Sequence, residues 1–365
     1  MAAVARSHTS FARVAPDASW SDVGCPRSEE LRLAYIHLRH DVRRAGLLDR
    51  AYGYYALVAA RSLVMLGAGL ALVFALPPTA PNLVLESVLL GFAFGQVALL
   101  GHDAGHLSVF RHARANWWLG ELCFGFVTGI GFAHWRHDHN LHHGRPNLCG
   151  SDPALETGGL LAFTEEQARS RRGWAMLITR YQAAAYVIGV SLLAFPFQIN
   201  GWRYALGRLH GRPRLAEVLI LAAGRFAFAA PFLMLGPRWA VVWIGAQLLG
   251  GAYQGLIVAP NHKGMPVLDT SEGLSFVEQQ MMTTRNVRPG RIADFVFGGL
   301  NYQLEHHLFP TMPRCRLGRA RGLVQEFCRA QRLPYDERSA LESYWTVLTE
   351  FNRIGRLAGQ RAALT

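Results

Sequence analysis

The chain has 365 residues, of which 51% are hydrophobic and only 17% are charged, and it carries a formal net charge of +12. Its 20 Phe, 9 Trp and 11 Tyr supply too much buriable surface for a disordered chain. Five scattered cysteines exclude a secreted disulfide scaffold. A basic excess favours nucleic acid or anionic lipid as a partner. Because uncharged stretches approach bilayer length and no nucleic-acid motif occurs, we interpret the charge as a membrane-surface feature and expect no nucleic-acid partner.

Long apolar segments predict membrane-crossing helices, since about 20 apolar residues span the hydrocarbon core. The segment 51–78 carries Arg61 as its only charge, and the segment 83–101 carries only Glu86. The proline-rich turn 77–82 separates them, so the sequence predicts a transmembrane hairpin. Basic residues flank its two open ends and favour a cytoplasmic location for both.

A second hairpin is expected from the segments 218–236 and 239–259, which a Gly-Pro-Arg turn separates. Arg225 lies inside the first of these, and we interpret it as a snorkelling or cavity-facing side chain. The segment 181–202 is also uncharged and long enough to span. Pro196 and the polar residues that follow it favour an interfacial or re-entrant course for this segment.

Eight of the fifteen histidines form four tight groups, two of which closely follow the apolar segments 83–101 and 239–259. The groups are His102 with His106; His139 with His142 and His143; His262; and His306 with His307. Spacings of three and four residues place imidazoles on one helix face. One metal rarely uses more than four or five protein nitrogens, so eight rings predict two metals. Because no cysteine joins them, we favour iron engaged in oxygen chemistry over structural zinc.

The four groups can meet only if they lie on one side of the membrane. The number of crossings between His143 and His262 must then be even, which again favours an interfacial course for 181–202. The sequence therefore predicts an all-α integral membrane protein, with four transmembrane helices in two hairpins and a cytoplasmic helical cap that holds a di-iron site. We expect a cytoplasmic N-terminal segment (1–50), a membrane domain (51–313) and a basic helical tail (314–365). Both termini and the metal site are expected in the cytoplasm.

The histidine groups form three boxes, HxxxH, HxxHH and QxxHH, in an order that resembles the membrane fatty acid desaturases. The surroundings Asn261-His262-Lys263-Gly264 and Gly299-Leu300-Asn301 are also similar, and the resemblance covers about residues 33–313. It implies that the eight histidines are ligands of two Fe ions. Gln303, at a position where many members have His, resembles the front-end desaturases, which act between an existing double bond and the carboxyl end.

Front-end desaturases commonly carry a fused cytochrome b5 domain with an HPGG haem motif. No HPGG occurs in this sequence, so we expect electrons from a separate ferredoxin or cytochrome b5-type protein. An unactivated methylene has no acidic proton, so its oxidation needs a metal-bound oxidant, with O₂ as co-substrate. The fatty acyl substrate is expected on CoA, a carrier protein or a phospholipid. The segment 117–132, rich in Trp, Phe and Gly, is a candidate lining of its slot, or ordinary interface packing.

Five further polar residues are candidates for supporting contacts to the metal ligands or for weak ligation: Gln303, Asn261, Asp103, Asp138 and Glu305. Plain surface charge or helix capping is the alternative for the carboxylates. The arginines after Pro313, which are Arg314, Arg316, Arg319 and Arg321, suggest a face for lipid headgroups or for an acidic electron donor.

Two other functions remain open. A di-iron hydroxylase or ketolase on the same scaffold differs only in the fate of the oxidised substrate. A non-enzymatic metal transporter would instead place its ligands along a path through the bilayer, or in a histidine-rich loop.

Overall fold

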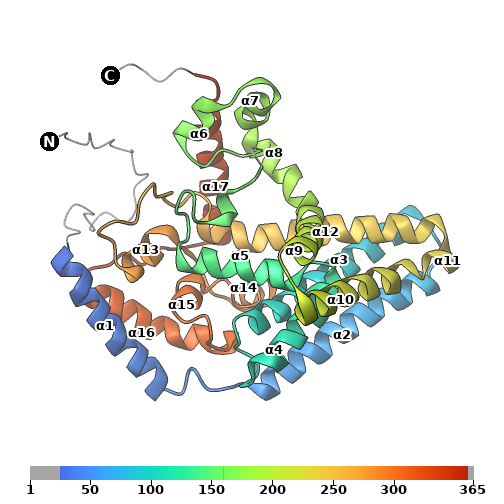
Figure 1. Cartoon of the computed structure of the whole chain (residues 1–365), viewed down its shortest axis with the longest axis horizontal. Coiled ribbons are helices and arrows are strands. Elements are labelled where there is room, and N and C mark those ends of the chain that lie inside the picture. Colours follow the sequence, from blue (N-terminus) through green and yellow to red (C-terminus); the bar gives the residue numbers. More distant parts are fainter. Residues whose placement is uncertain (1–24, 159, 361–365) are drawn as a thin grey trace.

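The computed structural model describes residues 25–158 and 160–360, and within them almost all of the regular secondary structure is helical (Figure 1). The first half contains α1 (Cys25–Arg44), α2 (Tyr52–Ala75), α3 (Ala80–Gly105), α4 (Ala113–Gly120), the π-helical turn η2 (Glu121–Thr128), α5 (Phe132–Gly144), η3 (Pro153–Leu155), α6 (Glu165–Ser170), α7 (Gly173–Arg180), α8 (Gln182–Gly189) and η4 (Val190–Leu192). The second half contains α9 (Ala194–Gly207), α10 (Gly211–Ala229), α11 (Phe232–Leu235), α12 (Pro237–His262), α13 (Phe276–Thr283), β1 (Asn286–Val287), α14 (Arg291–Val296), α15 (Gln303–Leu308), η5 (Arg314–Arg316), α16 (Leu317–Ala330), β2 (Glu337–Arg338) and α17 (Ala340–Gly355). The predicted all-α class is confirmed.

Four of the described helical segments are long and apolar enough to cross a membrane, as predicted: Tyr52–Ala75, Ala80–Gly105, Gly211–Leu235 and Pro237–His262. Helix α3 is the central one, because it packs against both α2 and α12. The contact with α12 is close: a Cβ on Gly91 would lie 2.9 Å from the backbone oxygen of Ala246. Glu86, the one acid of α3's apolar stretch, is buried and ion-paired with Arg238 of α12 at 2.6 Å. A paired charge of this kind is tolerated inside a membrane protein.

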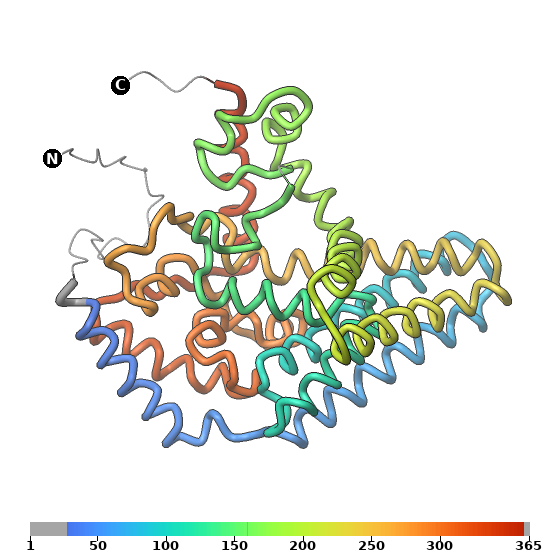
Figure 2. The backbone as a smooth tube through the Cα atoms, viewed as in Figure 1, coloured from blue at the N-terminus to red at the C-terminus, as the bar shows by residue number. Residues whose placement is uncertain are grey.

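The segment 181–202 is divided into α8, η4 and α9, and a sharp bend lies at its start. Helix α7 and the stretch Gln182–Leu192 meet there at an angle of 87°. Trp174, Leu177 and Ile188 expose their apolar side chains along this bent segment. In Figure 2, α7 and α8 rise beside α17, whereas η4 and α9 pack against the long apolar helix α12. A bent segment with exposed apolar side chains is compatible with an interfacial course.

Helices α1, α13, α15 and α16 share a buried core that includes apolar residues of the third histidine box. Leu38 of α1, Met281 of α13, Leu304 of α15 and Val324 of α16 belong to one apolar cluster. In the short parallel pair of β1 and β2, Asn286 lies opposite Glu337 and Val287 opposite Arg338. The chain after Pro313 is therefore part of the structure that encloses the third box.

Candidate metal centre

All eight histidines of the four sequence groups converge in two adjacent sets of rings. One set contains His102, His106, His139, His143 and His306, and the other contains His142, His262 and His307. Within each set, the nitrogens available for ligation lie within 4.8 Å of one another. Helices α3 and α12 bring in His102 and His262 near their C-terminal ends, α5 supplies the three histidines of the second box, and α15 supplies the third box.

The spacing of the ring nitrogens fits bound metal ions. The Nε2 atom of His139 lies 2.9 Å from that of His106 and 3.1 Å from those of His102 and His143. Two nitrogens at right angles on one ion, with bonds of about 2.1 Å, are about 3.0 Å apart. The Nε2 atoms of His306 and His307 are buried and have no hydrogen-bond partner. Burying such polar atoms unpaired is costly, and a cation between the rings removes that cost.

The rings are held in the protonation state that metal binding requires. Burial, reinforced by the neighbouring rings, holds the pKa values of five histidines well below the ordinary 6.5; these are His106, His139, His143, His306 and His307. Neutral imidazole is the form that ligates a metal. At neutral pH these rings therefore offer lone pairs rather than positive charge.

Three groups orient rings of the smaller set through their Nδ1 atoms. His142 Nδ1 lies 2.9 Å from Asp152 Oδ2, His307 Nδ1 lies 2.8 Å from Gln280 Oε1, and His262 Nδ1 lies 3.1 Å from the backbone oxygen of Thr283. Each contact directs Nε2 toward the centre. Burial raises the pKa of Asp152, but His142, Lys263 and the Ala154 N–H together outweigh it, so the pKa lies below its usual range. We did not anticipate these supports from the sequence.

Two of the five polar residues proposed as supports contact the histidine sets. Asp103 Oδ1 lies 3.5 Å from His102 Nδ1, and the Gln303 side chain lies 3.1 Å from His262 Nε2. Asn261 supports Gln303, because its side-chain amide donates a hydrogen bond to Gln303 Oε1 at 3.2 Å. Gln303 thus lies beside the three-histidine set, with its amide nitrogen facing His262.

The other two carboxylates serve other contacts. Asp138 lies 3.2 Å from His134 and 3.0 Å from His137, and neither of these histidines belongs to the two sets. Glu305 is fully buried and accepts hydrogen bonds from Asn286 and Tyr335 at 2.8 and 2.7 Å. Burial raises the pKa of Glu305, although these two donors oppose the rise. Its role is to join the third box to β1 and the loop before β2.

A buried carboxyl pair anchors the helix that carries the second box. Glu217 of α10 accepts a hydrogen bond of 3.1 Å from the backbone N–H of Ala133, in the first turn of α5. An acceptor at this position satisfies one of the free donors of a helix N-terminus. Burial and the neighbouring Glu217 carboxyl raise the pKa of Glu121 to about 10. Glu121 is therefore protonated at neutral pH.

Three aromatic rings from the region of 117–132 and from α5 stack beside the larger set. The ring centroids of Phe124 and Trp135 are 4.6 Å apart with planes at 24°, and Trp135 stacks on His139 at 4.4 Å and 23°. Phe132 lies parallel to both. A Cβ on Gly105 would lie 2.5 Å from the Trp135 ring, so the glycine lets the indole reach the histidines. The stack forms an apolar wall of the site.

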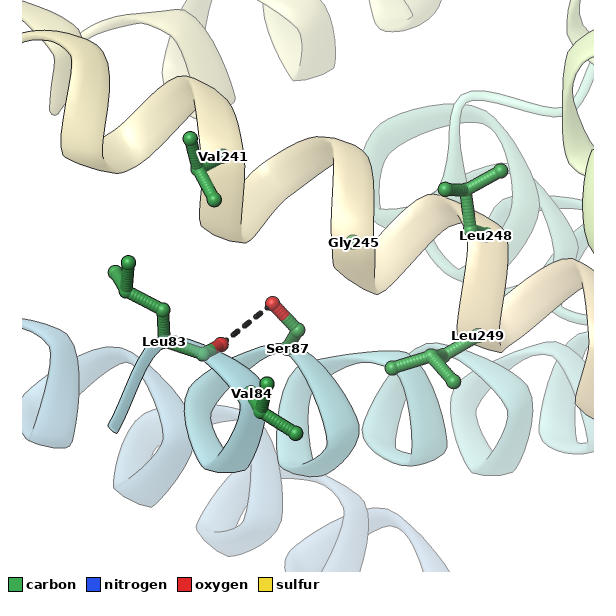
Figure 3. Close-up of a pocket in the computed structure, with 7 residues that line it drawn as sticks. All are labelled: Leu83, Val84, Ser87, Val241, Gly245, Leu248 and Leu249. Atoms are coloured by element: carbon green, nitrogen blue, oxygen red, sulfur yellow. Dashed lines mark hydrogen bonds between the residues drawn. The ribbon is translucent and has the colours of Figure 1, made fainter. Parts of the chain in front are cut away.

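An apolar groove between α3 and α12 lies far from this centre (Figure 3). It has a volume of about 300 Å³ and is lined by Leu83, Val84, Ser87, Val241, Gly245, Leu248 and Leu249. Leu83 precedes His102 by 19 residues on the same helix, which corresponds to about 28 Å at a rise of 1.5 Å per residue. A substrate carbon in this groove is therefore out of reach of the histidines.

The sequence predicts a surface role for Arg314, but in the structure this residue is buried. The residue is only 5% exposed, and its guanidinium forms an ion pair of 2.8 Å with Asp103. It cannot present a charge to lipid headgroups or to an electron donor. Arg319 is exposed, so the surface interpretation survives only for other arginines of this tail.

Four apolar helices and a buried centre lined by imidazoles define a membrane protein with a histidine-rich metal site. Residues 77–339 match the family described as fatty acid desaturase. The chain therefore belongs to the fatty acid desaturase family, whose members are oxidoreductases.

Three relatives illustrate the similarity. The chain is 27% identical to the Delta(5) fatty acid desaturase of Caenorhabditis elegans over 92% of its own length and 76% of the relative's. It is 28% identical to the Acyl-lipid (9-3)-desaturase of Physcomitrium patens, covering 92% of the chain and 65% of that protein. It is 30% identical to the Delta(8)-fatty-acid desaturase of Euglena gracilis, covering 68% of the chain and 62% of that protein. The chain thus spans less than two thirds of the length of the last two relatives.

Proposed function

We propose that this protein is an O₂-dependent fatty acyl desaturase that introduces a double bond into an acyl chain. The observation that carries the proposal is the pair of adjacent histidine sets, five rings and three, inside a chain of the desaturase family. Two Fe ions held by these sets would supply the reduction of O₂ and the removal of two hydrogens from adjacent methylenes.

The protein's own residues prepare the site for this chemistry. Asp152, Gln280 and the Thr283 carbonyl hold three rings in the orientation in which Nε2 faces the centre. The apolar wall of Phe124, Trp135 and Phe132 beside His139 excludes water from one side. Exclusion of water protects a reactive oxidant from side reactions. An acyl methylene against this wall would lie next to the five-histidine set.

We further propose front-end selectivity, with the new double bond on the carboxyl side of an existing one. Two of the three relatives are named for positions 5 and 8, and another from Caenorhabditis elegans, 28% identical over 69% of the chain, is named for position 6. Gln303 supports the proposal, because it lies 3.1 Å from His262 in place of a ninth ring. The acyl carrier is CoA, a carrier protein or a phospholipid, and electrons come from a separate ferredoxin or cytochrome b5-type protein.

We propose that the four apolar helices form two transmembrane hairpins and that the metal centre faces the cytoplasm. The support is that His143 and His262 belong to adjacent sets, which requires an even number of crossings between them. Gly211–Leu235 and Pro237–His262 provide two crossings if the bent segment lies in the interface. A reporter fused to the C-terminus is expected in the cytoplasm, and a reporter outside it would contradict this arrangement.

The activity is tested by expressing the chain in cells that lack polyunsaturated lipids and supplying a fatty acid with one double bond. Mass spectrometry that maps double-bond positions is expected to detect a new double bond on the carboxyl side. A variant with His142→Ala is expected to produce none. A hydroxylated or keto product in place of the double bond would support the alternative reaction, and an unchanged lipid profile would contradict both.

A further inference from the structure

Arg314 occupies a position that is unusual for an arginine in a basic tail. Its side chain is 4% exposed, and its Nε atom lies 2.8 Å from Asp103 Oδ2, whose side chain is 7% exposed. The approach lies off the N–H axis, so the contact is an ion pair rather than a well-aligned hydrogen bond. A buried charge without a partner costs several kcal/mol, so each of these two charges depends on the other.

Asp103 connects this ion pair to the metal centre. It directly follows His102 at the end of α3, and its second oxygen, Oδ1, lies 3.5 Å from the Nδ1 atom of the His102 ring. This distance is long for a hydrogen bond, so the carboxylate acts mainly through its charge and its fixed position. Its backbone oxygen also accepts a hydrogen bond of 2.8 Å from Ser108, which fixes the chain just after α3.

The same guanidinium also contacts the segment that leads into the third box. Arg314 Nη1 donates to the backbone oxygen of Gly298 at 3.2 Å. Gly298 and Gly299 have φ values of +59° and +88°, which favour glycine. A Cβ on Gly298 would lie 2.8 Å from Arg314 Nη1, so the turn is shaped around the arginine. Four residues after Gly299, Gln303 begins α15, which carries His306 and His307.

We propose that Arg314 is a positioning residue of the metal centre. Its guanidinium fixes the Asp103 carboxylate beside His102 and simultaneously holds the turn that leads to the third box. It therefore couples the first and third histidine boxes, which both contribute to the five-histidine set. The inference rests on the proposed function, because it concerns the ligands of the proposed iron site.

The test compares the purified variants Arg314→Met, Arg314→Lys and the double variant Asp103→Asn/Arg314→Met with the full-length wild type. Metal affinity is measured by competition with a chelator, and folding by thermal unfolding. Arg314→Met is expected to bind one of its two Fe ions about 10–100-fold more weakly, the usual effect of losing a group that orients a ligand. Arg314→Lys is expected to be intermediate, because one ammonium cannot reach both Asp103 and Gly298.

The double variant separates positioning from a merely structural ion pair. Removing both charges is expected to restore the melting temperature, while the weaker metal binding persists and one of two iron signals in the Mössbauer spectrum remains altered. Arg321, which pairs with the half-buried Glu337 at 2.7 Å, supplies the matched control, and Arg321→Met is expected to bind metal normally.

Two outcomes would overturn the inference. One is wild-type metal affinity in Arg314→Met. The other is recovery of both stability and metal affinity in the double variant. Failure of the proposed function is distinguishable from both, because the wild-type protein itself would then bind no iron.

Discussion

Replacing Asp152 by Asn is expected to weaken the three-histidine metal site selectively. Asp152 Oδ2 faces His142 Nδ1 at 2.9 Å and accepts from the Asn147 N–H at 2.8 Å, while Oδ1 accepts from the Ala154 N–H at 2.8 Å. An amide has only one oxygen, so the variant leaves one of these sides without an acceptor. Hydrogen bonds to charged groups contribute about 1.5–3 kcal/mol. Losing a ligand-orienting partner typically costs about 10–100-fold in metal affinity.

The assay is competition for iron between the purified protein and a chelator of known affinity. Asp152→Asn is expected to release one ion at a chelator concentration about 10–100-fold lower than the wild type. Asp138→Asn is the matched control, because Asp138 also contacts histidines, His134 and His137, but none in the two sets. Equal losses in the two variants, or an unchanged affinity in Asp152→Asn, would refute the assignment of Asp152 as the support of His142.

Three further substitutions test other parts of the site. The variant His262→Ala is expected to insert into the membrane but to lose desaturation and part of its iron. The control His210→Ala, at an exposed position, is expected to keep its activity and its iron. A normal iron content in His262→Ala would exclude His262 as a ligand. Gly105→Ala places a Cβ 2.5 Å from the Trp135 indole ring and is expected to lower the free energy of unfolding by about 1–3 kcal/mol. Gly144→Ala, with open space around its Cβ, is not expected to destabilise the protein. Burial raises the pKa of Glu121 to about 10, so this carboxyl group is neutral at physiological pH. Glu121→Gln is therefore expected to preserve the melting temperature, whereas Glu121→Ala is expected to lower it.

The four apolar helices and the eight histidines were predictable because their signals are local. A long uncharged segment and a spacing of three or four residues can be read without tertiary structure. The division into sets of five and three was not predictable, since His142 and His143 are neighbours in sequence but belong to different sets. Successive helical residues point about 100° apart. His143 therefore meets His106, whereas His142 meets His262, and only the tertiary structure decides this division.

The supporting residues were harder to predict, because they come from distant segments. Gln280 orients His307 from 27 residues away, and no pattern in the sequence connects the two. Glu305 adjoins His306 but its carboxylate points toward Asn286 and Tyr335. Arg314 lies among arginines that are exposed or half-buried, and composition alone cannot separate the one buried cation from its neighbours.

The proposed di-iron centre is tested by the metal content of the purified wild-type protein measured together with its turnover. We expect about two Fe per chain, because eight imidazoles exceed what one ion uses, and desaturation that requires both O₂ and a reductant. One metal ion per chain, or full desaturase activity in a zinc-loaded protein without iron, would contradict it.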